Sequence, residues 1–423
     1  ASFSRFEVKP LLLDGKNTLG IEVTNTGEQP NPAGVIGKLF IDLTNGASIT
    51  VPIDKTWKAN ERAPRGWLKA DYDDAAWSTV IELGPMGIEP WGTPRLPEPM
   101  PLFRKDFETT QPVKRALLYV CGLGFHEVHV NGQRVGDAVL EPGWTNYRKT
   151  CLYSAYDVTA QIASGKNAVG VMLGNGMYNV PGGRYVKFTG SFGQPKLLLQ
   201  LRLEYADGST AEIVSDGTWK SAPGPIVFSC IYGGEDYDAR KEITGWDQPG
   251  SNTGAWKNVI VTDGPGGRLS AAAAPPIKVM ETFSTAKVSQ PKPGVFVYDL
   301  GHNFSGWPKL SVRGASGSTV KLIPGELLDK EGKVSQKSSG GPMWFSYTLK
   351  GDGVELWTPR FSYYGFRYVQ VEGACPAGDT SAGGLPEVVD LAGDFTYSSA
   401  ERVGEFSCAN PLVNQVHDLI LAA

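Results

Sequence analysis

An internal repeat is the feature that most constrains the fold of this 423-residue chain. Its first part recurs after 150 residues, and its second part recurs after 162 residues. The matching pairs are Phe6–Val8 with Tyr156–Val158, Lys16–Gly20 with Lys166–Gly170, and Asp54–Lys58 with Asp216–Lys220. Short motifs that recur in the same order at a nearly fixed spacing indicate a duplicated structural unit. The chain therefore contains two copies of one unit.

The second copy has a front end for which the first copy shows no counterpart. This front end begins near Pro101 and includes the motifs Val128–Gly132 and Gly143–Thr145. At the spacing of the repeat, the first copy would begin about fifty residues before Ala1. Half a sandwich cannot bury its sheet face. We therefore expect residues 1–97 to be a truncated jelly-roll β-sandwich and Ala1 not to be the natural start.

Short β-rich runs separated by tight turns follow this first unit. Asn131-Gly132 and Asp207-Gly208 are dipeptides typical of two-residue hairpins, and 52 Gly and 30 Pro suit a fold with many turns. A proline-rich, stiff linker around residues 90–101 leads to residues 98–265, where we predict a complete galactose-binding-like jelly-roll sandwich. Its expected strands are Arg115–Val120, Glu127–Val130, Ala168–Leu173, Leu197–Tyr205 and Ala211–Val214.

A second joint, rich in Gly, Ala and Pro, covers residues 264–276. We predict a further β-sandwich after it, at residues 277–398. The fold class is therefore all-β, with tandem jelly-roll sandwiches followed by this third unit. The expected strands of the third unit are Val295–Leu300, Lys309–Val312, Thr319–Ile323, Trp344–Leu349 and Phe366–Val371.

Only the end of the chain has a helical pattern. Asn410 followed by Pro411 is typical of an N-cap and a first helical position. Apolar residues then recur at helical spacing on one face. We interpret residues 399–423 as a linker and the first helix of a helical domain that should follow. The apolar positions of this face are Leu412, Val413, Val416, Leu419 and Ile420.

Charge and composition exclude several classes of function. The net charge of −4 and the absence of a basic run give no indication of a nucleic-acid or membrane partner. No apolar stretch approaches the 18 residues of a membrane span. The cysteines and histidines lack the spacing of a metal site, so we interpret both as structural residues. They are Cys121, Cys151, Cys230, Cys375, Cys408, His126, His129, His302 and His417.

A succession of motifs after residue 298 resembles a known enzyme family. The motifs are Asp299–Trp307, Gly325–Leu328, Tyr347–Gly351 and Pro359–Val369. Their order resembles the β-sandwich that precedes the catalytic domain of bacterial α-L-rhamnosidases of glycoside hydrolase family 78. Upstream motifs resemble the family's N-terminal sandwich, and Glu405–Leu412 resembles the start of its (α/α)6 barrel. These upstream motifs are Val130–Gly132, Pro142–Thr145, Tyr156–Thr159, Gly174–Tyr178 and Glu235–Arg240.

The resemblance implies inverting hydrolysis that removes terminal α-L-rhamnose from a glycan or glycoside, in the periplasm or outside the cell. The family's catalytic carboxylates lie in the helical barrel, so we assign no catalytic residue to this chain and expect the barrel to be its missing partner. Asp236 and Asp238 are an alternative pair. We interpret them as an acidic loop cluster held by Arg240 and Lys241.

The resemblance also suggests a sugar site. The second sandwich is similar to carbohydrate-binding module family 67, whose members bind rhamnose through a calcium ion. On that basis calcium is the one cofactor considered, although no metal ligand is assigned. The alternative is that the tryptophan fills the core and Asn175-Gly176 makes a turn. The candidate sugar-binding residues are Trp144, Asn146, Asn175, Tyr178 and Asn179.

Two segments depart from the family pattern. The usual Gly-x-Gly-Trp-Tyr is Gly-Asn-Gly-Met-Tyr at residues 174–178, and the loop Lys337–Trp344 is rich in Ser and Gly. Trp344, Tyr363 and Tyr364 either line a groove facing the helical barrel or pack in the core. Two competing functions stay open: a stand-alone lectin-like carbohydrate-binding protein, and another exo-glycosidase with a similar β-sandwich forepart.

Overall fold

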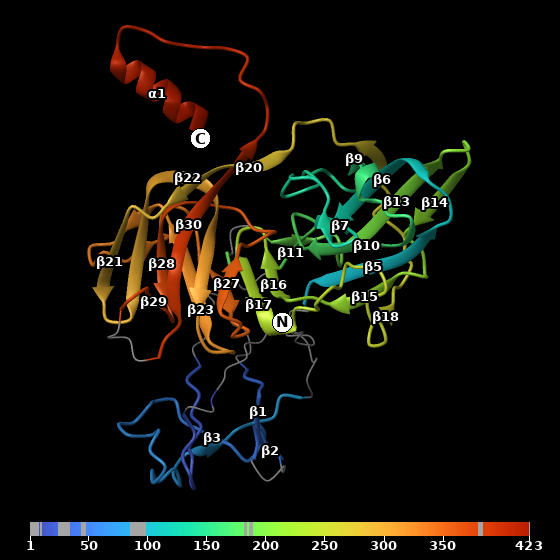
Figure 1. The fold of residues 1–423 in the computed structure, drawn as a ribbon. Helices are drawn as coiled ribbons and strands as arrows, with labels where there is room; N and C mark the ends of the chain where they lie inside the picture. The colour runs from blue at the N-terminus through green and yellow to red at the C-terminus, as the bar shows by residue number, and fades with distance from the viewer. Residues whose placement is uncertain are drawn as a thin grey trace. The chain divides into compact units, whose positions relative to one another are not determined.

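The computed structural model describes residues 8, 11–23, 34–43, 48–84, 99–181, 184–185, 189–379 and 384–422. Within these residues the regular secondary structure is almost entirely β-strand, with two short 3-10 turns and one α-helix at the C-terminal end (Figure 1). This confirms the predicted all-β class. The chain forms two compact units, Ala1–Leu96 and Pro97–Ala423, here called unit 1 and unit 2.

The repeat is built in unit 2 as a hydrogen-bonded turn that positions a tryptophan. The Asp216 carboxylate accepts hydrogen bonds from the backbone N–H of Thr218, at 2.9 Å, and from its hydroxyl. The Trp219 indole N–H donates to the Val214 carbonyl at 2.7 Å, and the Trp219 carbonyl accepts from the Val259 N–H at 3.2 Å. An Asx-turn of this kind fixes the backbone direction just before a strand.

Unit 1 makes the same turn with the matching residues. The Asp54 carboxylate accepts from the Thr56 N–H at 2.9 Å and from the Thr56 hydroxyl at 2.5 Å. The Trp57 indole donates to the Pro52 carbonyl at 2.8 Å, and the Trp57 carbonyl accepts from the Val80 N–H at 3.2 Å. The two copies of this motif therefore form the same turn with the same hydrogen bonds.

A second part of the repeat is an asparagine that closes a turn on itself. In unit 2 the Asn167 amide accepts from the Ala163 N–H at 2.8 Å and donates to the Ala163 carbonyl at 2.9 Å. In unit 1, Asn17 makes the same two bonds to Leu13, both at 2.8 Å. The first motif of the repeat, at residues 6–8, lies largely outside the described residues.

Unit 2 begins with a sandwich of two antiparallel sheets, ordered β18-β15-β5-β10-β7-β8 and β14-β13-β6-β9, with β19 added in parallel to β9. Alternating residues of the facing strands fill the space between the sheets, and Trp219 lies among them at 1% exposure. The strands are β5 Pro101–Thr109, β6 Val113–Leu123, β7 Phe125–Val130, β8 Gln133–Arg134, β9 Thr150–Asp157, β10 Gly165–Gly174, β13 Lys196–Tyr205, β14 Thr210–Val214, β15 Lys220–Pro223, β18 Lys257–Asn258 and β19 Arg268–Ala271.

The hairpin between β7 and β8 is the one that its turn residues predict. Asn131 and Gly132 both have positive φ angles, of 52° and 80°. Val130 pairs with Gln133 across this two-residue loop. Two successive positive φ angles define a type I′ turn, which matches the twist of antiparallel strands.

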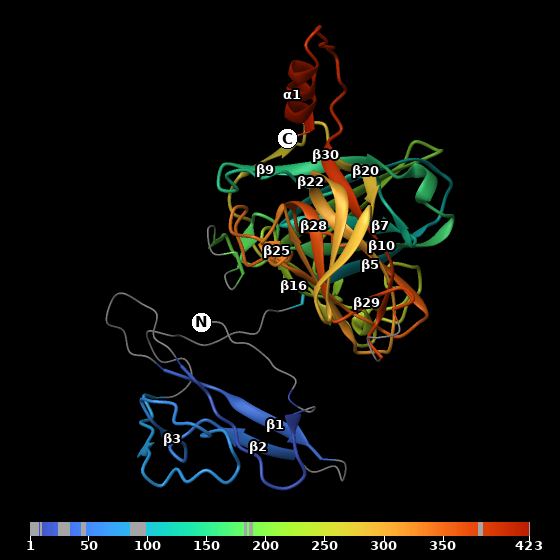
Figure 2. The same ribbon diagram turned by 90° about the vertical axis from the view of Figure 1, so that its left-hand side faces the viewer.

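A larger, curled sheet follows the sandwich, and its central strands run side by side in Figure 2. Its main path is β16-β17-β26-β23-β28-β22-β30-β20, with β21 and β27 on β22 and β29 on β30. We call it the third sheet. Its strands are β16 Ile226–Cys230, β17 Gly234–Asp238, β20 Ile277–Ser284, β21 Lys287–Lys292, β22 Val295–Arg313, β23 Thr319–Gly325, β26 Phe345–Thr348, β27 Val354–Trp357, β28 Tyr364–Glu372, β29 Cys375–Pro376 and β30 Glu387–Ser398.

Two predicted strands of the third sheet, Val295–Leu300 and Lys309–Val312, are parts of one long strand, β22. The register of β22 against β28 shifts between Asp299 and Phe304, where the strand bends. Gly306 permits a close approach to β30, because a Cβ atom there would overlap the Asp394 carbonyl oxygen.

Strands β16 and β17 belong to the third sheet, although sequence analysis placed them in the sandwich at residues 98–265. Strand β17 pairs in parallel with β26, and Tyr237 stands opposite Tyr347. Ile226 and Tyr237 pack in the same core as Trp357 of β27. Strands β16 and β17 thus follow the sandwich strands in sequence but pair and pack with the third sheet. The two parts of unit 2 are therefore in direct contact.

The remaining described elements are short. The helix α1, Pro411–Ala422, begins as predicted, because the Asn410 side chain accepts a hydrogen bond from the Leu412 N–H at 3.0 Å. Among the described residues, no helix combines the length and apolar character needed to cross a membrane. The other strands are β1 Lys38–Asp42, β2 Ser48–Pro52, β3 Lys58–Ala59, β4 Ser78–Thr79, β11 Asn179–Val180, β12 Gly190–Ser191, β24 Leu327–Leu328 and β25 Val334–Ser335.

Candidate functional site

The structure brings three of the five predicted sugar-binding residues together, but as packing and not as a binding surface. The Asn175 side chain is buried, donating to the Ser229 carbonyl and accepting from Asn179, both at 2.8 Å. Tyr178 is 1% exposed, and its ring packs edge to face on Tyr147 at 5.1 Å. The expectation that Asn175 and Tyr178 contact a sugar is therefore corrected, because neither side chain reaches the surface.

The other two predicted residues lie at the surface, on the loop between β8 and β9. Trp144 is 61% exposed. Asn146 is also exposed, and its amide oxygen accepts from the Arg148 N–H at 3.2 Å. Trp144 and Asn146 thus stay candidates for contact with a sugar.

This loop does not fit the calcium ion that the resemblance suggests. Calcium takes six to eight oxygen ligands, usually including carboxylates. The amide oxygens of Asn146 and Asn175 already accept hydrogen bonds. Across the described ranges, no three His, Cys, Asp or Glu side chains are grouped as metal ligands. The residues of this loop therefore do not fit a calcium ion.

The alternative acidic pair is held by arginines. Arg240 donates two bonds to the Asp238 carboxylate, at 2.8 and 2.9 Å, and these bonds lower the pKa of Asp238. Asp236 pairs with Arg184 and accepts from the Ser346 hydroxyl at 2.5 Å. The predicted pairing of Asp238 with Arg240 is confirmed, but the partner of Asp236 is Arg184 instead of Lys241. The predicted loop is wrong, because both aspartates lie in strand β17.

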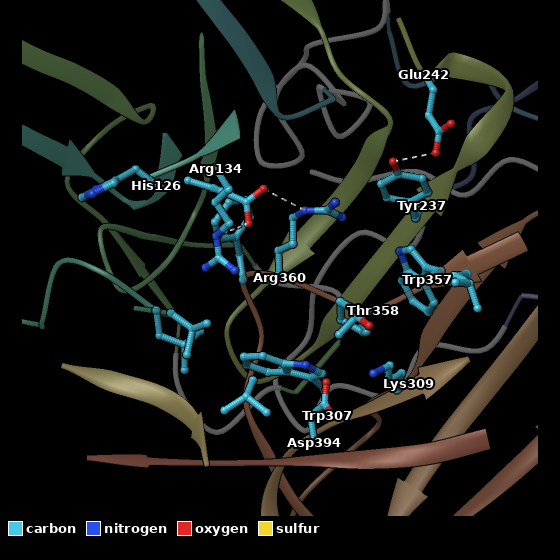
Figure 3. Close-up of a pocket in the computed structure, with 17 residues that line it drawn as sticks. His126, Arg134, Tyr237, Glu242, Trp307, Lys309, Trp357, Thr358, Arg360 and Asp394 are labelled. Atoms are coloured by element: carbon cyan, nitrogen blue, oxygen red, sulfur yellow. Dashed lines mark hydrogen bonds and ion pairs between the residues drawn. The ribbon is translucent and has the colours of Figure 1, made fainter. Parts of the chain in front are cut away.

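A cleft of about 380 Å³ lies where the sandwich meets the third sheet (Figure 3). The sandwich contributes residues from β7 and the loop after β8, and the third sheet contributes β17, β22 and the segment after β27. The labelled side chains in Figure 3 come from both sides of the cleft. They are His126, Arg134, Tyr237, Glu242, Trp307, Lys309, Trp357, Thr358, Arg360 and Asp394.

Glu127 is the centre of an ion cluster at this cleft. Its carboxylate lies 3.3 Å from Arg360, 3.3 Å from Arg134 and 3.1 Å from His129, and the side chain is 13% exposed. Burial opposes ionisation of Glu127, but the charges of Arg360 and Arg134 and the hydrogen bond with His129 outweigh it and lower the pKa of Glu127 to about 2. Glu127 on β7 and Arg360 after β27 therefore join the sandwich to the third sheet.

Glu235 of β17 lies behind Arg360 and is completely buried. One carboxylate oxygen accepts from the backbone N–H groups of Arg360 and Phe361, at 3.2 and 3.4 Å. Its second oxygen has no partner in the described part of the chain. Burial raises the pKa of Glu235 to about 7, against the lowering effect of Arg360. Such a pKa suits a general acid, but a carboxyl group with no exposed surface cannot reach a substrate.

We expect Glu235 to make stability depend on pH. A carboxyl group whose pKa rises from 4.5 to about 7 on folding holds its proton more tightly in the folded state. Stability is then greatest below pH 4.5 and falls as pH rises through 7. Glu235→Gln should remove this loss and gain about 2–3 kcal/mol relative to the wild type at pH 8, and little at pH 5. Urea unfolding at both pH values checks this, and parallel pH profiles of the two proteins would contradict it.

Sequence reasoning missed this ion cluster because its members are distant in the chain. Glu127 and Arg360 are 233 residues apart, and Glu235 is 125 residues from Arg360. The one available signal was a charged residue inside a predicted strand, since buried strand positions seldom carry an unpaired charge.

Comparison with known proteins shows that this chain matches two domain families, one after the other. Residues 111–281 match the Alpha-L-rhamnosidase N-terminal domain, and residues 289–387 match the Bacterial alpha-L-rhamnosidase concanavalin-like domain. An α-L-rhamnosidase of Streptomyces avermitilis is 36% identical over 412 residues, which are 96% of this chain and 39% of the relative. An α-L-rhamnosidase of Formosa agariphila is 32% identical, covering 86% of this chain and 40% of the relative.

Solved structures give the same result. The Streptomyces avermitilis α-L-rhamnosidase complexed with L-rhamnose has a TM-score of 0.77 at 36% identity, covering 92% of this chain and 37% of that chain. The α-L-rhamnosidase from Dictyoglomus thermophilum has a TM-score of 0.70 at 41% identity, covering 77% of this chain and 35% of that chain. The chain spans about two fifths of the length of the curated relatives it matches. It belongs to the bacterial α-L-rhamnosidase family, and it contains that family's N-terminal and concanavalin-like domains.

Proposed function

We propose that this chain is the β-sandwich portion of an α-L-rhamnosidase that removes terminal α-L-rhamnose from glycans or glycosides by inverting hydrolysis. The observation that carries the proposal is the match of both rhamnosidase domains, in order, along this chain, together with a rhamnosidase relative that aligns with 96% of it. A helical catalytic domain would supply the reacting carboxylates, and unit 2 would support it.

The state of the carboxylates in and behind the cleft favours a supporting role. Glu127 is surrounded by three cationic or polar partners, and Glu235 is fully buried. Glu242 accepts from the Tyr237 hydroxyl and from Lys350, both at 2.9 Å. Inverting glycosidases need two carboxyl groups about 6.5–9.5 Å apart with room for water between them. Groups already neutralised by neighbours are poorly suited to that chemistry.

The test is release of L-rhamnose from an aryl α-L-rhamnoside. This chain alone should release none above background. The same chain joined to the helical domain of its own protein should release it with inversion, visible by proton NMR as the β-anomer formed first. No release by the longer protein would contradict the proposed activity, and release by this chain alone would contradict the supporting role. A periplasmic or extracellular location is part of the same proposal.

The alternative, a stand-alone lectin-like protein, has no comparable support. The relatives and solved structures described above are rhamnosidases. Sugar binding is nevertheless compatible with a supporting domain, and the exposed Trp144 is the predicted residue best placed for it. A binding role within the enzyme is therefore considered below.

A further inference from the structure

The Ser/Gly-rich loop that departs from the family pattern lies beside an unusual tyrosine. Tyr185 has a φ angle of +47°, in the left-handed region that bulky residues seldom adopt. Its backbone N–H donates to the Pro342 carbonyl in that loop, at 3.0 Å. A residue held in this conformation by its surroundings is a reason to look for function at the position.

Three half-buried tyrosines gather around this position. The rings of Tyr185 and Tyr232 are 5.1 Å apart at an angle of 35°. The N–H of Tyr363 donates to the carbonyl of Ile231 at 3.0 Å, which places Tyr363 beside Tyr232. Burial raises the pKa of Tyr232, and the phenols of Tyr185 and Tyr363 add to this effect because they lie close to it. The three side chains keep part of their surface open to solvent.

A carboxylate is hydrogen-bonded to the same Ser/Gly-rich loop that holds Tyr185. Glu326 accepts from the Asn303 amide at 3.2 Å and from the Ser339 hydroxyl of the Ser/Gly-rich loop at 2.6 Å. The Tyr364 hydroxyl donates to the Gly340 carbonyl at 2.5 Å. Burial raises the pKa of Tyr364 to about 12, and the nearby Glu326 carboxylate and Tyr185 phenol contribute. We call Tyr185, Tyr232, Tyr363 and Glu326, with Asn303 beside them, the tyrosine surface.

The chemistry of the tyrosine surface matches a saccharide better than an apolar partner. Sugar C–H faces pack on aromatic rings, and sugar hydroxyls need partners that accept as well as donate. An ionised carboxylate offers about four acceptor positions, and Glu326 uses two of them within the chain. The hydroxyls of Tyr185 and Tyr363 and the Asn303 amide supply donors and further acceptors. A deoxyhexose adds a methyl group that can lie against a ring.

We propose that the tyrosine surface is an ancillary binding site for a rhamnosyl unit of the glycan, separate from the helical catalytic domain and from the Trp144 loop. The rings of Tyr185, Tyr232 and Tyr363 contact the apolar face and methyl group of the sugar. Glu326 and Asn303 bind its hydroxyls. Only the choice of rhamnose rests on the proposed function of the longer protein.

The test is calorimetric titration of the full chain with L-rhamnose and with an oligosaccharide that ends in α-L-rhamnose. Wild-type protein should release binding heat. Glu326→Gln should weaken binding about tenfold or more through the lost charge-assisted bond, and Tyr232→Ala should weaken it several-fold. Tyr119→Ala is the matched control, because Tyr119 is also half-buried and pairs with Tyr153 at 6.0 Å on the sandwich. It should bind like the wild type.

Each other outcome overturns the proposal. No binding heat from wild-type protein would exclude the site. If the helical domain then shielded Tyr232 from solvent in the longer protein, the tyrosine surface would be a contact between domains. Heat that is lost in Trp144→Ala and kept in Glu326→Gln would place the sugar on the predicted loop instead. Equal weakening by Tyr119→Ala and Tyr232→Ala would contradict the tyrosine surface as the binding site, because the loss would not depend on that position. Failure of the longer protein to hydrolyse rhamnosides would leave these titrations unchanged, so the two proposals fail separately.

Discussion

Replacing Glu127 by Ala should destabilise unit 2 by about 2–3 kcal/mol. The change leaves Arg360 and Arg134 without their shared partner, in a cluster where Glu127 is 13% exposed. The loss is costly because Arg360 and Arg134, whose side chains are 30% and 39% exposed, are only partly solvated and lose a charge-assisted bond. Urea unfolding followed by tryptophan fluorescence measures the difference.

Asp137→Ala is the matched control for this change. Asp137 also links the sandwich to the third sheet, through an ion pair with Lys278 at 2.9 Å, but it is 74% exposed. Exposed pairs contribute at most about 1 kcal/mol. If Glu127→Ala costs no more than Asp137→Ala, the ion cluster does not hold the two sheets together.

Trp219→Ala should cost unit 2 about 3–5 kcal/mol, whereas Trp57→Ala should cost unit 1 much less. The two tryptophans make the same indole-to-carbonyl bond, at 2.7 and 2.8 Å. Trp219 is 1% exposed in the sandwich core, and Trp57 is only half-buried. Comparing the two variants therefore separates the stabilisation that comes from burying the ring from the stabilisation that comes from the local hydrogen bonds.

Hydrogen exchange read separately for each unit measures both costs. Amides of β13 should lose most of their protection in Trp219→Ala, because the ring packs in the core that β13 helps to form. Amides of β3 and β4 should change little in Trp57→Ala. Equal losses of protection in the two variants would mean that the tryptophan stabilises each unit through the hydrogen-bonded turn and not through burial of its ring.

Local features of this fold could be predicted from sequence, because they depend on neighbouring residues. The Asp-x-Thr-Trp turn and the Asn410 cap are confirmed by short-range hydrogen bonds, and the Asn131-Gly132 hairpin is confirmed by its φ angles and strand pairing. The period-two runs likewise became strands such as β6 and β13. Each follows from turn chemistry or from alternation along one segment.

Features that depend on distant contacts could not be predicted. Strands β16 and β17 look like part of the sandwich in sequence, but their side chains complete the core of the third sheet. Tyr178 was expected at a binding loop, yet it is buried against Tyr147. The Glu127–Arg360 pair spans 233 residues. No local pattern encodes which distant segment will cover a given side chain.

The shared strands lead to one central claim: the two rhamnosidase domains form a single cooperative scaffold in unit 2. The most direct test is native-state hydrogen exchange on the full chain in increasing urea. Amides of β10 in the sandwich and of β17 and β28 in the third sheet should converge on one opening free energy, and Glu127→Ala should lower all three together. Separate opening free energies, with β10 unaffected by loss of stability in the third sheet, would contradict the claim.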